Sequence, residues 1–270
     1  MLKSLQIGEI MKKLIGLLIG FFITFNSAYC ADMRFIQVDS VLFSPTDEQS
    51  VTQLKNLIND INVQKNVEFV IFSGDNIAKA KKENLESFLK LAKKLKQPYY
   101  LVLGSKDVNK QKGIGKKEYM KIVSENCRAH KKIESPNYVF EKRGVIFIVL
   151  DGAREVIPSP MGYYKEDTLN WLENTLSYYR DKKIVIIQHF PIIAPVKKES
   201  RYTFKPARYL ELLQRYSNVK AIYAGNFGVN NEQNINGVVH VSTANAPLYR
   251  IVDIIDIDTS NPEFWSVIKE

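Results

Sequence analysis

Cysteine is scarce in this 270-residue chain, which contains only Cys30 and Cys127. Because Cys30 falls at the end of a predicted signal peptide, the mature protein keeps one cysteine and cannot form an internal disulfide. Internal repeats, low-complexity tracts and interdomain linkers are also lacking. An apolar content of 45% is ordinary for a globular protein, so we expect one domain with a sizeable hydrophobic core.

The sequence also lacks an aromatic-interleaved basic stripe or other nucleic-acid motif, although its formal net charge is +9. The lysine excess is scattered over stretches such as KAKK at 79–82 and NKQKGIGKK at 109–117. We therefore expect a solvated lysine-rich surface and no specific nucleic-acid partner. Attraction to an anionic envelope or to phosphate-bearing ligands is the alternative.

No apolar run is long enough to span a bilayer comfortably. The run at 14–25 follows Lys12 and Lys13 and precedes small residues at a possible cleavage site, as in a secretory signal. We predict a signal peptide at 1–30, a domain at 31–270, and an exported protein, periplasmic or secreted, with no membrane span after cleavage. An uncleaved anchor is the alternative, and the residues before Cys30 do not favour a lipoprotein. The codons possible for 8–10 resemble a bacterial ribosome-binding site, which favours a start at Met11.

The first third of the domain reads as strand, helix, strand, helix, strand. The predicted elements span 34–38, 46–62, 67–72, 80–96 and 99–103. An aspartate follows each of the three apolar strands, namely Asp39, Asp75 and Asp107. Because the carboxyl ends of parallel strands meet at one edge of a sheet, three such carboxylates predict a functional site there.

The rest of the domain is less regular. Predicted helices span 117–127, 162–180 and 206–216, with Thr46 expected to cap the earlier helix at 46–62. Predicted strands span 138–141, 145–151, 183–189, 219–224, 237–242, 249–257 and 264–268. We expect His130 to be solvated at a helix end, and His240 to pack or face outward rather than line the site.

Five strand ends carry polar motifs whose order resembles that of the calcineurin-like metallophosphoesterases. Their pattern is DxH, GDxx(D/Y), GNH(D/E), a single His and GHxH. The corresponding segments here are Asp39-Ser40-Val41, Gly74-Asp75-Asn76, Gly104-Ser105-Lys106-Asp107, His189 within QHFPI, and Gly225-Asn226-Phe227-Gly228. The resemblance covers residues 34–258 and implies an α/β fold, a four-layer α/β/β/α sandwich of two mixed β-sheets flanked by helices.

The resemblance implies two metal ions that share Asp75. The first would be held by Asp39, Asp75 and the residues at Val41 and Gly228, where the family has histidines; neither replacement has a side-chain donor, so we expect this site to be empty. The second would be held by Asp75, Ser105, His189 and Asn226. Such a set suits one Mn²⁺ or Mg²⁺ better than Zn²⁺, and the absence of any metal is the alternative.

Lys106 takes the place of the family's catalytic histidine, and Asp107 ends the same motif. A lysine with an ordinary pKa is a poor general acid at neutral pH, but it carries a fixed positive charge. We therefore assign Lys106 and Asp107 to the catalytic positions. We also hypothesise that Lys106 partly neutralises Asp39, Asp75 and Asp107 in place of a lost metal ion.

Three functions remain open. The first is an exported protein of this family whose phosphoester hydrolysis is weak or absent, because that chemistry depends on two metal ions. The second is a phosphomonoesterase or diesterase that uses one divalent ion, with a phosphorylated small molecule as its substrate. The third is a pseudoenzyme that binds a phosphate ligand or a protein. The sequence does not indicate an oligomeric state.

Overall fold

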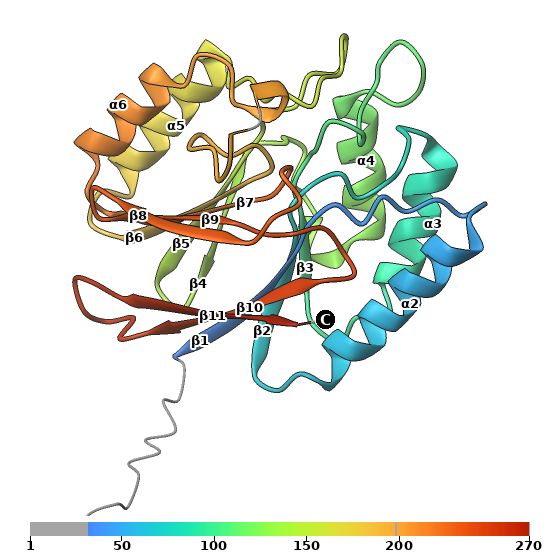
Figure 1. Ribbon diagram of the computed structural model, residues 1–270, viewed down its shortest axis with the longest axis horizontal. Helices are drawn as coiled ribbons and strands as arrows, with labels where there is room; N and C mark the ends of the chain where they lie inside the picture. The colour runs from blue at the N-terminus through green and yellow to red at the C-terminus, as the bar shows by residue number, and fades with distance from the viewer. Residues whose placement is uncertain (1–31, 198, 270) are drawn as a thin grey trace, which may run out of the picture. The chain divides into compact units, whose positions relative to one another are not determined.

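Two mixed β-sheets lie at the centre of the part of the chain that the computed structural model describes, residues 32–197 and 199–269 (Figure 1). The five-stranded sheet has the order β11-β10-β1-β2-β3, and the six-stranded sheet has the order β4-β5-β6-β7-β9-β8. The strands are β1 (Met33–Val38), β2 (Val67–Phe72), β3 (Tyr99–Leu101), β4 (Tyr138–Lys142), β5 (Val145–Leu150), β6 (Lys183–Gln188), β7 (Val219–Ala224), β8 (Asn231–Ile235), β9 (Val238–Ser242), β10 (Tyr249–Ile255) and β11 (Glu263–Lys269). The predicted signal peptide and the start at Met11 lie outside the described residues.

Both sheets combine a block of parallel strands with antiparallel strands, and the five-stranded sheet ends on one side in the parallel strand β3. β1, β2 and β3 run parallel, as do β5, β6, β7 and β9, whereas β10, β11, β4 and β8 pair antiparallel to their neighbours. Parallel strands that are covered on both faces are expected to be apolar throughout, which is why these segments stood out in the sequence. The carboxyl ends of the parallel strands carry the polar motifs.

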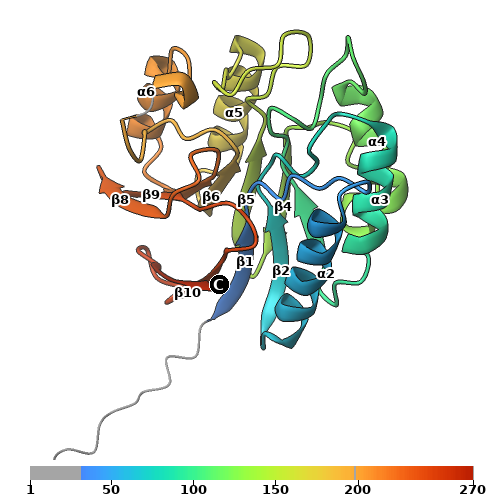
Figure 2. The same ribbon diagram turned by 45° about the vertical axis from the view of Figure 1, so that its right-hand side comes forward.

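Helices cover the outer faces of the two sheets (Figures 1 and 2). They are α2 (Glu48–Val63), α3 (Lys82–Ala92), α4 (Lys116–Asn126), α5 (Glu166–Tyr178) and α6 (Ala207–Arg215), with short 3₁₀ turns η1 (Arg128–His130) and η2 (Glu199–Arg201). The first three pack on the five-stranded sheet, and α5 and α6 pack on the other. This is the predicted four-layer arrangement, which is confirmed.

Alternation along the strands builds the three apolar layers. In β1, Phe35 faces the other sheet while Ile36 and Val38 face α2 and α3. Phe35 stacks on Phe69 of the same sheet and contacts Phe147 of the other sheet edge to face. The second contact packs the two sheets against each other. The inner layer thereby fixes the distance between the strand ends of one sheet and those of the other.

Two local predictions are wrong. Asp47, not Thr46, caps α2, since its Oδ1 accepts a hydrogen bond of 3.0 Å from the Gln49 N–H. Strand β8 was missed because its sequence, NEQNI, has no apolar alternation. It pairs with β9 at the edge of the six-stranded sheet, where exposed polar side chains are tolerated. Among the described residues, no helix combines the length and apolar character needed to cross a membrane.

His130 is fully buried, so the prediction that it is solvated is wrong. Its Nε2 accepts a hydrogen bond of 2.9 Å from the Leu101 N–H at the end of β3, a contact that the basic sequence around it does not reveal. Burial lowers the pKa of His130 to about 4, so the ring is neutral in the folded protein. The His130 ring therefore contacts the end of β3 as an uncharged hydrogen-bond acceptor.

We predict that acid weakens the fold through His130. Its folded pKa lies below the unfolded value near 6.5, so the unfolded chain takes up the proton first, and stability falls as the pH drops from 6.5 towards 4. His130→Gln offers an uncharged acceptor to Leu101. Between pH 7 and pH 5 the wild type should lose about 2 kcal/mol more unfolding free energy than this variant, measured by urea denaturation. Parallel pH profiles would contradict the assignment.

Candidate functional site

Polar residues from both sheets meet at the carboxyl ends of the parallel strands. Asp39 follows β1 and Asp75 follows β2 in the five-stranded sheet, while His189 follows β6 and Asn226 follows β7 in the six-stranded sheet. All four side chains are buried. The sheet packing described above therefore brings together four of the residues that the sequence placed in one site.

The His189 ring lies between the two carboxylates. Its Nδ1 is 3.4 Å from Asp39 Oδ1, and its Nε2 is 3.6 Å from Asp75 Oδ1. Nδ1 also lies 2.8 Å from the Ser73 carbonyl oxygen, which can only accept a hydrogen bond, so Nδ1 carries a proton. If the ring were neutral, the lone pair of Nε2 would point at the Asp75 carboxylate, and the two would repel each other. A cation between them, or protonation of the ring, removes this repulsion.

The charges of the three groups are coupled. Burial opposes protonation of the ring, but the carboxylates of Asp75 and Asp39 raise the pKa of His189 well above its ordinary value. Burial likewise opposes ionisation of Asp75, but the His189 charge and the Lys106 N–H hold the pKa of that carboxyl below its ordinary value. An imidazolium between two carboxylates is the arrangement that these opposing contributions favour.

Hydrogen bonds from the chain satisfy the remaining oxygen positions of Asp39. Its Oδ1 accepts from the Ser73 hydroxyl at 2.9 Å, and its Oδ2 accepts from the Ser40 hydroxyl at 2.7 Å and the Asn226 N–H at 3.1 Å. Asp39 is fully buried, so these donors replace the water that a carboxylate would otherwise bind. Ser40 and Ser73 were not among the predicted site residues.

Asp75 is held by the loop that follows β3. Its Oδ1 accepts a hydrogen bond of 2.8 Å from the Lys106 N–H, and the Ser105 hydroxyl lies 3.2 and 3.3 Å from its two oxygens. Ser105 and Lys106 therefore reach the predicted position beside Asp75. The hydrogen bond comes from the Lys106 backbone, and its exposed ammonium forms no ion pair with a carboxylate among the described residues. The positive charge of the ammonium nevertheless helps to lower the pKa of Asp75.

Asp107 and Asn226 point their side chains away from this centre. Asp107 is fully buried and accepts hydrogen bonds from the Gly104 and Ile77 N–H groups, at 2.8 and 3.1 Å. Burial and the Asp75 charge raise the pKa of Asp107 to about 7. The Asn226 amide donates to the carbonyls of Pro160 and Arg201, so its backbone rather than its side chain faces Asp39.

Strained and tightly packed backbone holds the site together. Ser40, Asp75 and Asn226 have φ angles of 49°, 50° and 67°, a region that costs a side chain about 1–3 kcal/mol. A Cβ at Gly74 would lie 2.5 Å from His189 Nδ1, and one at Gly225 would lie 1.7 Å from Asp39 Oδ1. Glycine is therefore needed at both positions for the ring and the carboxylate to approach the strand ends so closely.

A chain of buried hydrogen bonds supports the centre from the sheet interior. Arg250 Nε donates to the Thr243 hydroxyl at 3.1 Å, which donates to Gln37 Oε1 at 2.7 Å. Gln37 Nε2 in turn donates to the Ser73 hydroxyl at 3.1 Å, and Ser73 donates to Asp39. No local pattern in the sequence indicates these bonds, because they link residues from four separate segments.

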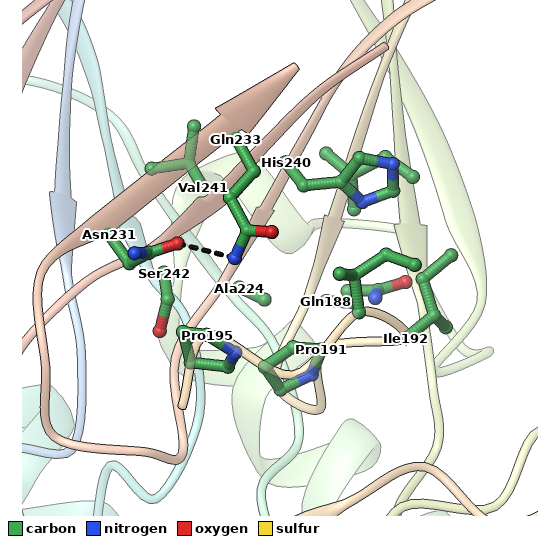
Figure 3. Close-up of a pocket in the computed structure, with 12 residues that line it drawn as sticks. Gln188, Pro191, Ile192, Pro195, Ala224, Asn231, Gln233, His240, Val241 and Ser242 are labelled. Carbon is green, nitrogen blue, oxygen red and sulfur yellow. Dashed lines mark hydrogen bonds between the residues drawn. The ribbon is translucent and has the colours of Figure 1, made fainter. Parts of the chain in front are cut away.

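His240 does not belong to the site. It lies on the helix-facing side of β9, where burial lowers its pKa to about 4. Figure 3 shows it with Gln188 and Ser242 around a cavity of about 10 Å³, roughly the space of one water molecule. The expectation that His240 stays outside the site agrees with this position, although the ring is buried rather than outward-facing.

The residues at this centre do not suit a two-metal site. At the first position, Val41 and Gly228 replace ligating side chains; at the second, the Asn226 amide is bound elsewhere and the Ser105 hydroxyl contacts Asp75. Across residues 32–197 and 199–269, no three His, Cys, Asp or Glu side chains form a group that could hold a metal ion. The donor set therefore lacks the three or four strong ligands that transition metals require.

The layered sheets and the strand-end carboxylates define a protein of the metallophosphoesterase class. The family model for calcineurin-like phosphoesterases matches residues 28–225. The chain belongs to this calcineurin-like phosphoesterase family. A comparison with curated proteins finds no match.

Solved structures share the fold at low sequence identity. The chain is similar to a dimetal phosphatase from Danio rerio, with 12% identity, a TM-score of 0.67, and coverage of 89% of this chain and 100% of that one. It is also similar to GAP50, the anchor in the inner membrane complex of Plasmodium, with 16% identity, a TM-score of 0.57, and coverage of 88% and 89%. The protein TT1561 of Thermus thermophilus has 12% identity, a TM-score of 0.58, and coverage of 86% and 98%.

We predict that His189 is essential to stability and that the Lys106 side chain is not. His189→Asn keeps a donor for the Ser73 carbonyl but removes the charge between two buried carboxylates, so it should cost about 3–5 kcal/mol of unfolding free energy. Lys106→Ala leaves the backbone N–H on Asp75 and should change the value by less than about 0.5 kcal/mol. Urea unfolding at neutral pH measures both. A larger loss for Lys106→Ala would favour the hypothesis that its ammonium partly neutralises the cluster.

Proposed function

We propose that this protein is an exported family member whose metal-dependent phosphoester hydrolysis is weak or absent, and which acts by binding. The observation that carries the proposal is the His189 ring between Asp39 and Asp75. In the two-metal mechanism, cations at such carboxylates generate hydroxide and clamp the phosphoryl oxygens. Here a protein side chain faces both carboxylates, and Val41 and Gly228 offer no ligand for an additional ion.

The hydrogen bonds around the two aspartates support the same proposal. Both carboxylate oxygens of Asp39 have donors from the chain, and Asp75 accepts from the Lys106 N–H and the Ser105 hydroxyl. A metal ion would have to displace contacts that already satisfy these carboxylates. The loss of that stabilisation would oppose metal binding at low concentration.

The Plasmodium protein has a similar fold and is named for a binding role. That protein is described as an anchor in a membrane complex, and its chain matches this one over most of both lengths. The proposal for the present chain is a binding partner that carries phosphate groups or is itself a protein. Neither a specific nucleic acid nor an oligomeric state is part of the proposal.

A phosphoesterase that uses one divalent ion is the second candidate. The observation that favours it is the Nε2 atom of His189, which is buried without a hydrogen-bond partner and faces Asp75. Asp75, Ser105 and His189 would be its ligands, with Asn226 as the fourth only if its amide left the carbonyls of Pro160 and Arg201. That requirement makes the second candidate weaker than the first.

We predict that purified residues 32–270 contain less than stoichiometric metal and hydrolyse neither 4-nitrophenyl phosphate nor bis(4-nitrophenyl) phosphate when Mn²⁺ is added. Metal content is measured by inductively coupled plasma mass spectrometry, and turnover by release of nitrophenolate. The Asp75→Asn variant is the matched control and should give the same background rate. Stoichiometric metal with turnover that Asp75→Asn abolishes would overturn the proposal and favour the single-ion enzyme.

Export rests on the signal-like segment at residues 1–30, in which Lys12 and Lys13 directly precede the apolar run. We predict that the chain expressed from Met11 in a bacterial host accumulates in the periplasm or medium, and that intact mass spectrometry finds the mature amino terminus near Ala31. Removal of residues 14–25 should leave the protein in the cytoplasm. Full-length protein retained in the membrane fraction would instead support an uncleaved anchor.

A further inference from the structure

A pocket of about 280 Å³ lies beside the candidate site, between the loop after β2 and the loop after β3. Pro158, from the loop after β5, forms part of its lining. Four of its ten lining residues are lysines, and none is an aspartate or a glutamate: Lys79, Lys81, Lys106 and Lys112. All charged side chains of the pocket lining are therefore positive, and lysines that are scattered along the sequence are gathered here in space.

The loops that carry these lysines are fixed by backbone contacts. The Ile114 N–H donates to the Ala80 carbonyl at 2.9 Å, and a Cβ at Gly113 would lie 1.8 Å from that same oxygen. Asn109 Oδ1 accepts from the Lys112 N–H at 3.1 Å. The close approach at Gly113 thus brings the KAKK and NKQKGIGKK stretches together in a fixed geometry, which limits the entropy lost on binding a ligand.

No acidic side chain of the described residues forms an ion pair with the cluster. Within the described part of the chain, none of the four lysine ammonium groups lies within 4.0 Å of a carboxylate, whereas Lys116 nearby pairs with Asp151. Glu155, close to this region, accepts from the Lys116 N–H. Like charges held together repel one another, and a multiply charged anion relieves this repulsion.

The amino terminus of α3 adds to the positive potential. The helix starts at Lys82, directly after the pocket residue Lys81, and has no side-chain cap on its first N–H groups. Unsatisfied N–H groups at a helix start attract anions, phosphate in particular. This contribution is independent of the lysine side chains and favours the same class of ligand.

We propose that this lysine-lined pocket binds a ligand with two or more adjacent phosphate groups. The inference rests on the binding role proposed above, because it specifies which ligand a protein without hydrolase activity would bind. The phosphates can belong to a soluble molecule or to lipid headgroups. The second source is suggested by the exposed apolar residues Val156 and Ile157, 51% and 70% exposed, which precede Pro158 at the pocket.

The test uses residues 32–270 in EDTA, so that binding is measured apart from any metal-dependent turnover. Isothermal calorimetry with tripolyphosphate reports the soluble source. Co-flotation with phosphatidylcholine vesicles, with and without cardiolipin, reports the lipid source. Replacing Lys79, Lys81 and Lys112 by glutamine, with Lys106 unchanged, should weaken binding at least about tenfold in whichever arm the wild type binds, because each change removes a charge-assisted contact.

A triple variant with the same loss of charge at a distance from the pocket is the control. Lys55, Lys90 and Lys121 are exposed helical lysines, and their replacement by glutamine should leave affinity within about twofold of the wild type. Absence of binding in both arms, or equal weakening in the two triple variants, would overturn the inference. Release of inorganic phosphate from tripolyphosphate with Mn²⁺, measured separately, would instead contradict the absence of hydrolysis and leave the pocket assignment standing.

Discussion

Two carboxylates buried at the junction of two sheets set the main electrostatic constraint on this protein. A carboxylate removed from water is costly unless hydrogen bonds and an opposite charge compensate it. Asp39 and Asp75 project from the five-stranded sheet, and His189 reaches them from the six-stranded sheet. The contact therefore compensates the carboxylates and joins the two sheets at their carboxyl ends.

The surrounding structure follows from this contact. Gly74 and Gly225 permit the close approach of the ring and the carboxylate to the strand ends. Ser73 links the centre to Gln37, Thr243 and Arg250, so the interior of both sheets fixes the position of the charges. The side chains and backbone around the two aspartates thereby hold them in place at the strand ends.

Much of the fold could be predicted from the sequence, because the parallel strands are buried on both faces and read as apolar segments. The positions of Asp39, Asp75 and His189 followed from the strand ends. The burial of His130 and the orientation of the Asn226 amide could not be predicted, since partners far along the chain determine both. The hydrogen bond from the Lys106 N–H to Asp75 could not be predicted either, because it depends on how the loop after β3 folds.

The lysine pocket illustrates the same limit. Its lysines come from two loops whose sequences favoured a solvated surface over a site for phosphate-bearing ligands, and the packing of Gly113 on Ala80 brings them together. Charge that is scattered along a sequence can therefore be concentrated in space by one close backbone contact. The protein thus has a charge-compensated centre at the strand ends and, beside it, a pocket lined by lysines without ion-pair partners among the residues that the structure describes.

The melting temperature of residues 32–270 in EDTA and in excess Mn²⁺ tests the central claim most directly, because a ligand that binds only the folded state raises stability. The account predicts the same melting temperature in both solutions, since His189 already compensates Asp39 and Asp75. A rise with Mn²⁺ that Asp75→Asn abolishes would contradict it.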